Sequence, residues 1–177
     1  MEFFDIYNED GSLAGYKADR GETHRKGLWH RTVHIWILNS QGEVLLQKRA
    51  MDKETFPGFW DISCAGHIDA GELPEDAAIR ELCEELGIRI SKKELQYLFT
   101  IRQCYHKDNP LIIENEFSEV FLLRSTRDID SMNCNEEVTD LKWVDISELA
   151  NGRLENVAEH GEEYRNLQQF LSDGKPL

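Results

Sequence analysis

The most informative part of the sequence runs from Gly66 to Ile88 and reads GHIDAGELPEDAAIRELCEELGI. Its second half predicts a helix over Pro74–Leu86. Proline fits the first turn of a helix, where its missing N–H is not needed, and acidic residues near this end suit the helix dipole. Gly87 then ends the helix. The first half, Gly66–Glu72, is a glycine-flanked loop that leads into the helix.

One face of this predicted helix is acidic. At about 100° per residue, one side carries Arg80, Glu81, Glu84 and Glu85. The opposite, apolar side is expected to pack on the body of the protein and carries Ile79, Leu82, Cys83 and Leu86. Glu81 forms like-charge pairs with Glu84 and Glu85, each unfavourable by roughly a few tenths of a kcal/mol. A divalent cation would relieve this repulsion, because Mg²⁺ and Mn²⁺ prefer carboxylate and carbonyl oxygens.

A solvated acidic face, partly neutralised by Arg80, is the simpler interpretation of such a helix. The segment in front of the helix favours the metal site, because its acid Glu72 is placed to reach Arg80. Together, loop and helix match the Nudix box at its defining positions, which are Gly66, Glu72, Arg80-Glu81-Leu82, Glu84-Glu85 and Gly87-Ile88. The chain therefore resembles the Nudix hydrolases.

This resemblance implies an α/β (α+β) fold, the Nudix α/β/α sandwich with a mixed β-sheet. It also implies a MutT-like pyrophosphatase activity. The expected reaction is the divalent-metal-dependent hydrolysis of a diphosphate linkage in a nucleoside diphosphate derivative or a similar small diphosphate. The expected cofactor is Mg²⁺ or Mn²⁺.

The resemblance also implies a role for each residue of the box. Glu81, Glu84, Glu85 and the carbonyl group of Gly66 match the metal ligands, while Glu72 and Arg80 hold the loop and the helix together. A diphosphate is polyanionic, so the attack of water requires charge to be neutralised on phosphorus and on the leaving oxygen. A carboxylate must also accept a proton from the water. Glu81 is the first candidate for this base, and Glu116, on a facing strand, is the second.

A second resemblance extends beyond the box. Several segments of this chain resemble, in order and spacing, those of isopentenyl diphosphate isomerase and its Nudix-hydrolase relatives. These segments are His30–Leu38, Leu45–Ala50, Phe56–Trp60, Gly66-His67 and Glu114–Glu116. In the isomerase, three histidines and two glutamates hold a metal. The matching positions are His24 or a neighbour, His30, His67, Glu114 and Glu116. The spacing from His24 to His30 is one residue shorter than in the isomerase, and histidines are more often satisfied by local hydrogen bonds. This second set is therefore an alternative metal or polar site.

Arg49 and Lys53 match the positions that bind diphosphate in the isomerase. The formal net charge of the chain is −14, which excludes a general binder of nucleic-acid backbones. A protein of this charge needs a local basic pair, or a cation, to bind an anionic ligand. Arg49 and Lys53 are therefore candidate substrate-binding residues, with surface solubility as the alternative.

One position departs from the isomerase pattern. The catalytic cysteine of the isomerase directly precedes the Gly-His pair, and here that position is Ala65. Cys64 is its neighbour, but adjacent residues of a strand point to opposite faces, so Cys64 is expected in the core. Hydrolysis is the expected reaction. The alternatives are isopentenyl diphosphate isomerisation and a non-catalytic nucleotide-binding Nudix module.

The length of 177 residues predicts a single domain, 1–177, that includes N-terminal strands within 3–16 and a C-terminal helix over 155–171. No apolar run approaches the roughly 18 residues that span a bilayer, and the acidic N-terminus does not resemble a signal peptide. The four cysteines form no CxxC pair, so reduced thiols and a cytoplasmic location are expected. The expected partner is a small diphosphate, not a nucleic-acid polymer or a membrane, and a homodimer is left open.

The remaining elements follow from apolar patterns and turn residues. Strands are predicted over 3–7, 13–16, His30–Leu38, Glu43–Arg49, Trp60–Cys64, Gln96–Tyr105, Ile112–Arg124 and Val138–Val144. Residues 17–29 are expected to form a loop, and Lys107–Pro110 a turn.

Overall fold

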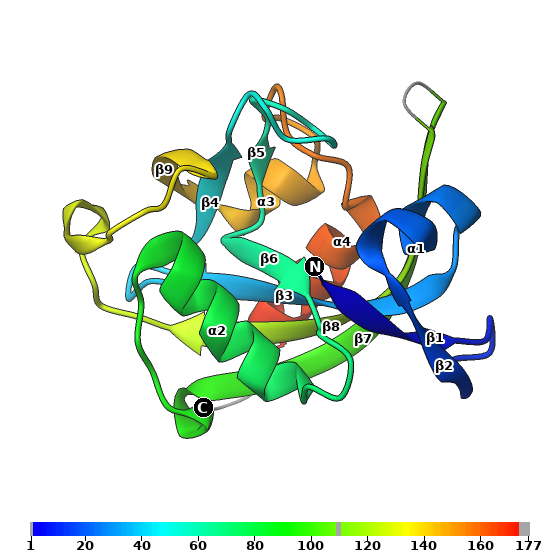
Figure 1. Ribbon diagram of the computed structural model, residues 1–177. Helices are drawn as coiled ribbons and strands as arrows, with labels where there is room; N and C mark the ends of the chain where they lie inside the picture. Colours follow the sequence, from blue (N-terminus) through cyan, green and yellow to red (C-terminus); the bar gives the residue numbers. More distant parts are fainter. Residues whose placement is uncertain (1, 109–110, 174–177) are drawn as a thin grey trace. The chain divides into compact units, whose positions relative to one another are not determined.

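The computed structural model describes residues 2–108 and 111–173 (Figure 1). It is a mixed α+β structure with a large mixed sheet and few helices, as the sequence predicts. The chain divides into two compact units. The first contains Met1–Ile35, Ala65–Glu81 and Ile90–Leu122, and the second contains Trp36–Cys64, Leu82–Arg89 and Leu123–Leu177. Four elements contribute residues to both units: strands β3 (Trp29–Leu38), β6 (Cys64–His67) and β8 (Leu111–Arg124), and helix α2 (Pro74–Leu86).

Most of the first unit consists of strands. Its further elements are β1 (Phe3–Tyr7), β2 (Leu13–Asp19), α1 (Arg20–Lys26), the 3-10 turn Lys92–Glu94 and β7 (Leu95–Asp108). β1 pairs with β2 and, through Tyr7 and Trp29, with β3. β6 and β8 also pair with β3, and β7 pairs with β8. The predicted turn Lys107–Pro110 lies partly outside the described residues, because Asn109 and Pro110 are not described.

Residues 17–29 are not a loop, so this prediction was wrong. β2 continues to Asp19, and helix α1 follows. The side chain of Asp19 accepts a hydrogen bond from the backbone N–H of Glu22 at 2.9 Å, which caps the helix. Gly27 ends it with a left-handed φ of 61°. Only Thr23 and His24 of α1 are buried, so the helix shows no apolar periodicity in the sequence.

The second unit is arranged around β4 (Glu43–Arg49), which pairs with three strands. These are the end of β3, β5 (Trp60–Asp61) and β9 (Val138–Asp145), all antiparallel to β4. The unit also contains the 3-10 turn Ile129–Ser131 and the helices α3 (Ile146–Ala150) and α4 (Gly161–Ser172). Its core includes the fully buried side chains Trp36, Leu45, Leu46, Ile62, Leu82 and Leu86.

Three further boundaries differ from the predictions. The C-terminal helix begins at Gly161 rather than at residue 155, because the preceding segment pairs with β5: Trp60 donates to Asn156 O, and Ala158 donates to Trp60 O, both at 2.8 Å. The predicted strand Trp60–Cys64 is split between β5 and β6. Helix α3 was not predicted, and it begins where the side chain of Asp145 caps Ser147 N at 2.7 Å. The helix predicted over Pro74–Leu86 is confirmed at both ends.

Candidate active site

Helix α2 carries the three carboxylates of the predicted metal site. Their environments differ: Glu84 is exposed, the side chain of Glu81 is 13% exposed, and Glu85 is buried. The simpler interpretation, a solvated acidic face, is therefore wrong for Glu85. In a continuous helix Glu81 still lies one turn before both Glu84 and Glu85, so the three carboxyl groups follow one side of α2.

In the first unit, Arg80 holds the loop before α2 against the helix. Its Nε and Nη2 atoms donate to the two carboxylate oxygens of Glu72 at 3.0 and 2.8 Å, and Nη2 also donates to His67 O at 2.9 Å. Nη1 donates to Glu81 Oε1 at 2.6 Å. The hydrogen bond with Glu72 raises the pKa of Arg80. Burial alone would raise the pKa of Glu72, but the bonds from Arg80 and from Asp69 N lower it. Charged hydrogen bonds thus join the loop to the helix.

Gly66 and Glu81 are in close contact. A Cβ atom built on Gly66 would overlap the carboxyl group of Glu81, so any other residue at position 66 would displace that carboxylate. The φ angle of Gly66 is not positive, so it is close approach, and not backbone conformation, that requires glycine here. The Glu81 carboxylate therefore lies directly against the backbone that carries the Gly66 carbonyl.

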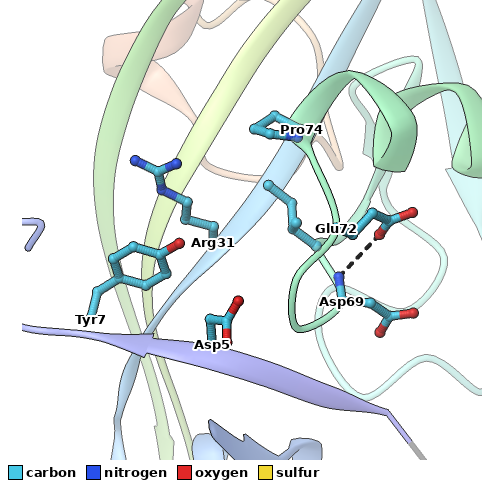
Figure 2. A pocket seen from close by; sticks show the side chains of 7 residues that line it. Asp5, Tyr7, Arg31, Asp69, Glu72 and Pro74 are labelled. Atoms are coloured by element: carbon cyan, nitrogen blue, oxygen red, sulfur yellow. Dashed lines mark hydrogen bonds between the residues drawn. The ribbon is translucent and has the colours of Figure 1, made fainter. Parts of the chain in front are cut away.

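A small, shallow polar pocket lies in the same unit. Figure 2 shows Tyr7, Arg31, Asp69 and Glu72 around it, with Asp69 N donating to Glu72 at 3.1 Å. Gly71 N donates to Asp5 on β1 at 2.8 Å. The acids of this pocket thus bind the backbone of the loop, and their bonds fix the loop in front of α2.

In the second unit, Glu85 is 5% exposed and is held by its neighbours. Gln47 Nε2, on β4, donates to Glu85 Oε2 at 3.1 Å. Burial raises the pKa of Glu85 to about 7, although hydrogen bonds from Cys64 and Gln47 and the charge of Lys53 oppose the rise. Both protonation states of this carboxyl group are therefore populated at neutral pH, and a bound cation would favour its charged form.

The two predicted phosphate-binding residues, Arg49 and Lys53, both have partners in the second unit. Arg49 Nη1 bonds to Asp61 Oδ2 at 3.2 Å, and Nε bonds to Thr55 O at 3.0 Å. Lys53 forms an ion pair with Glu137. The sequence analysis missed Gln47, Asp61, Thr55 and Glu137. The alternation of β4 is a signal that could have found Gln47, because it places residues 47 and 49 on one face.

The histidines of the alternative metal set come together in the first unit. Nitrogen atoms of His24, His30 and His67 all lie within 4.8 Å of one another. Glu116 Oε1 is 3.5 Å from His30 Nε2 and 3.9 Å from His67 Nε2. Glu114 is two residues earlier on β8 and so on the same face as Glu116. Helix α1 brings His24 into the group despite its shorter spacing.

The chemistry of this cluster fits a cation. The Nε2 atoms of His24, His30 and His67 are buried and have no hydrogen-bond partner among residues 2–108 and 111–173. Burial lowers the pKa of His24 to about 4 and that of His67 well below its ordinary value, so both rings are neutral. Burial alone would raise the pKa of Glu116, but the adjacent ring of His30 outweighs it and lowers the pKa to about 2. Neutral imidazoles beside a carboxylate form a donor set for a divalent metal.

Residues 28–167 match the family model of the NUDIX domain. The chain belongs to the Nudix family. Nudix hydrolase 3 of Arabidopsis thaliana is 39% identical over 155 residues, which are 85% of this chain and 20% of that protein. The chain thus spans about a fifth of this relative. An uncharacterized Nudix hydrolase of Clostridium acetobutylicum is 39% identical over 153 residues, which are 84% of this chain and 72% of that protein.

Other Nudix relatives extend the comparison. Isopentenyl-diphosphate Delta-isomerase of Escherichia coli is 35% identical over 144 residues, which are 80% of this chain and 74% of that protein. The structure of DR0079 from Deinococcus radiodurans has a TM-score of 0.72 at 24% identity and covers 93% of this chain and 98% of its own. The NUDIX domain of Shewanella oneidensis NrtR, solved with ADP ribose, has a TM-score of 0.60 at 17% identity. The match covers 80% of this chain and 87% of that chain.

The structural neighbours share the Nudix fold, and the family and its hydrolases identify the chain as a hydrolase acting on pyrophosphate bonds. Nudix hydrolases generally require divalent metal ions. No helix within the described parts of the chain is long and apolar enough to cross a membrane.

Proposed function

We propose that this Nudix hydrolase uses Mg²⁺ or Mn²⁺ to hydrolyse the diphosphate linkage of a nucleoside diphosphate derivative or a similar small diphosphate. The observation that carries the proposal is the contact between Gly66 and Glu81. The Glu81 carboxyl group lies against the backbone of Gly66, and Glu84 and Glu85 follow one turn later in α2, which supports this proposal.

In this proposal Glu81, Glu84, Glu85 and the Gly66 carbonyl group hold the metal. All four offer oxygen atoms, which hard divalent cations prefer. The bound cation would neutralise charge on the diphosphate and lower the pKa of the attacking water. Glu81 is the proposed base, with Glu116 as the alternative. Arg80 and Glu72 orient Glu81 through the bonds that join loop and helix.

Arg49 and Lys53 are the proposed contacts to the phosphate groups. Arg49 follows two residues after Gln47, which bonds to Glu85, and in this proposal Lys53 would exchange Glu137 for the substrate. A positively charged pair compensates for the charge of −14 on the whole chain, which would otherwise repel a diphosphate.

A second proposed metal site is formed by His30, His67, Glu114 and Glu116, together with His24. Three buried Nε2 atoms that have no hydrogen-bond partner among the described residues, two of them within 4 Å of Glu116 Oε1, favour it. Calorimetric titration with Mn²⁺ tests it: the His67→Gln variant should lose one binding event, while a Glu84→Gln variant should lose a different one. Equal binding by wild type and His67→Gln would contradict this second site.

The alternatives are isomerisation and nucleotide binding without catalysis. Isomerisation is disfavoured by Ala65, whose methyl group can neither give nor accept a proton. Cys64, its neighbour, is fully buried and bonds to Glu85. A panel of nucleoside diphosphate derivatives and prenyl diphosphates, assayed with chelator or with millimolar Mg²⁺ or Mn²⁺, separates all three functions by the release of phosphate or monophosphate.

We also propose that the chain folds as one domain in a reducing, cytoplasmic environment. β3 and α2 each belong to both compact units, so unfolding one unit breaks elements of the other. The four cysteines are free, and the chain has no disulfide that needs an oxidising compartment among its described residues. If the chain is one domain, its unfolding should show a single cooperative transition. Light scattering would decide between a monomer and a homodimer.

A further inference from the structure

The guanidinium group of Arg49 is held on two sides. Its Nε and Nη2 atoms donate to the carbonyl and hydroxyl oxygens of Thr55 at 3.0 and 3.2 Å, and its Nη1 atom donates to Asp61 Oδ2 at 3.2 Å. The Arg49 side chain is 17% exposed. These contacts fix the plane of the guanidinium group, as well as its position.

The bonds leave part of the group free. A guanidinium carries five N–H donors. The bonds to Thr55 and Asp61 use the Nε donor and one donor of each terminal nitrogen, so that each terminal nitrogen keeps one donor without a partner among the described residues. The two remaining donors lie on one rigid plane, so they can contact a phosphate group in a fixed geometry, which the rotating ammonium group of a lysine cannot provide.

The direction of Arg49 follows from the register of β4. Gln47 and Arg49 are two residues apart on this strand, and Arg49 bonds to Asp61, the residue of β5 that is paired with Gln47, so both side chains lie on the same face. Gln47 bonds to Glu85 at 3.1 Å, and Glu85 is one of the proposed metal ligands. Within the second unit, Arg49 therefore extends from the strand face that contacts the metal-binding helix.

Asp61 is itself immobilised. It is 4% exposed, and Oδ1 accepts hydrogen bonds from His160 Nε2 at 3.0 Å and from Ile62 N at 2.8 Å. Burial alone would raise the pKa of Asp61, but His160 and Arg49 outweigh it and lower the pKa to about 2. Asp61 thus stays charged, and its second oxygen is directed at Arg49.

Thr55 is held by the loop between β4 and β5, residues 50–59. This loop is closed by Gly58 N donating to Arg49 O and by Arg49 N donating to Phe59 O. Phe56, directly after Thr55, has a φ of 46°, which is unfavourable for an aromatic residue. Strain of this kind persists where the surroundings fix a segment, often at a functional site. Here it accompanies a carbonyl group directed at Arg49.

We propose that Asp61 and Thr55 are positioning residues that hold Arg49 as a two-pronged donor for one phosphate group of the substrate. The inference rests on the proposed function and adds to it, because it assigns roles to residues outside the Nudix box. It predicts that Asp61 and Thr55 act on substrate binding only through Arg49.

The test compares Arg49→Lys, Asp61→Asn and Thr55→Val, and the double variants that combine Arg49→Lys with each of the others. We expect KM to rise about tenfold in Arg49→Lys and Asp61→Asn and about threefold in Thr55→Val, with kcat within about twofold of wild type. In the Arg49→Lys background, Asp61→Asn and Thr55→Val should cause no further rise, because a positioning residue loses its effect with its target. Asp52→Asn is the matched control: Asp52 is an exposed acid of the same loop, and KM should not change.

Binding of methylenediphosphonate in the presence of Mg²⁺, measured by calorimetry, gives a readout without turnover. Its dissociation constant should follow the same pattern as KM. Additive effects of Thr55→Val and Arg49→Lys, or unchanged affinity in Thr55→Val and Asp61→Asn, would overturn the proposal and leave these bonds structural. If Asp61→Asn does not fold, Thr55→Val still decides. If the wild-type protein hydrolyses no diphosphate, the proposed function is wrong. The calorimetric binding series still tests whether Asp61 and Thr55 position Arg49.

Discussion

Gly66 has no room for a side chain, because the carboxyl group of Glu81 occupies the place where its Cβ atom would lie. Two parts of the Nudix box that are separated in the sequence are therefore in direct contact, one through its backbone and the other through its carboxylate. The carboxyl group of Glu81 can therefore keep this position only if residue 66 is glycine.

Replacing Gly66 with alanine should therefore reduce kcat by about a hundredfold, since the added methyl group displaces Glu81 from the proposed metal site. Steady-state kinetics with Mg²⁺ would measure the effect. Gly21→Ala is the control, because a Cβ at Gly21 meets only Asp19 Oδ1 at 3.4 Å and the residue lies in α1. That variant should keep full activity. Full activity in Gly66→Ala would show that the position of Glu81 does not matter.

Glu84→Gln should cut kcat by a hundredfold or more, a loss of roughly 3 kcal/mol of transition-state stabilisation, and leave the fold intact. Glu84 is exposed, so its replacement should hardly change the free energy of unfolding. Circular dichroism and urea unfolding would check the fold alongside the kinetics. Glu75→Gln, in the first turn of the same helix, is a control that removes an equal charge. Loss of activity together with unfolding would make this face of α2 structural.

The raised pKa of Glu85 predicts a pH-dependent stability without metal. In the folded protein its pKa is about 7, above the ordinary value of 4.5, so the folded state binds more protons between these values. Its contribution to the free energy of unfolding is thus complete below about pH 4.5 and lost as the pH rises through 7. Urea unfolding in chelator at several pH values should show this decline, and Glu85→Gln should remove it. An unchanged slope in that variant would assign the decline to other groups.

Arg80→Lys should destabilise the protein by about 1–3 kcal/mol and lower kcat. A lysine keeps the charge but cannot bond to Glu72, His67 O and Glu81 together, as Arg80 does. Thermal unfolding and kinetics would measure both effects. Arg89→Lys, at an exposed residue beyond the helix, should change neither. If Arg80→Lys keeps the stability and activity of the wild type, Arg80 contributes only its positive charge and its individual hydrogen bonds are not required.

The protein should not interconvert isopentenyl and dimethylallyl diphosphates. That reaction adds a proton at one carbon and removes one from another, which requires an acid and a base on opposite faces of the substrate. The assay incubates the protein with labelled isopentenyl diphosphate and measures the formation of acid-labile product. Turnover that disappears in Cys64→Ser would show that Cys64 reaches the substrate, and would favour isomerisation.

The sequence predicted α2 to the residue, because its signals are local: a proline in the first turn, acids at the N-terminal end and a glycine after the last turn. It missed α1, which has seven residues and depends on the Asp19 cap and on the burial of His24. The burial of Glu85 could not be predicted, because a helical wheel shows which side of a helix a residue shares but not that Gln47 and Cys64 bond to it. The bond between Asp61 and His160 joins residues 99 positions apart, and no local pattern indicates it.

The loop over residues 50–59 begins and ends at backbone hydrogen bonds to Arg49, and it lies between two paired strands. The same segment contains Lys53 and Thr55, so the loop that returns the chain from β4 to β5 also carries groups on which the affinity for phosphate is proposed to depend. An insertion or deletion between residues 50 and 59 would therefore change the affinity for the substrate together with the connection between the two strands.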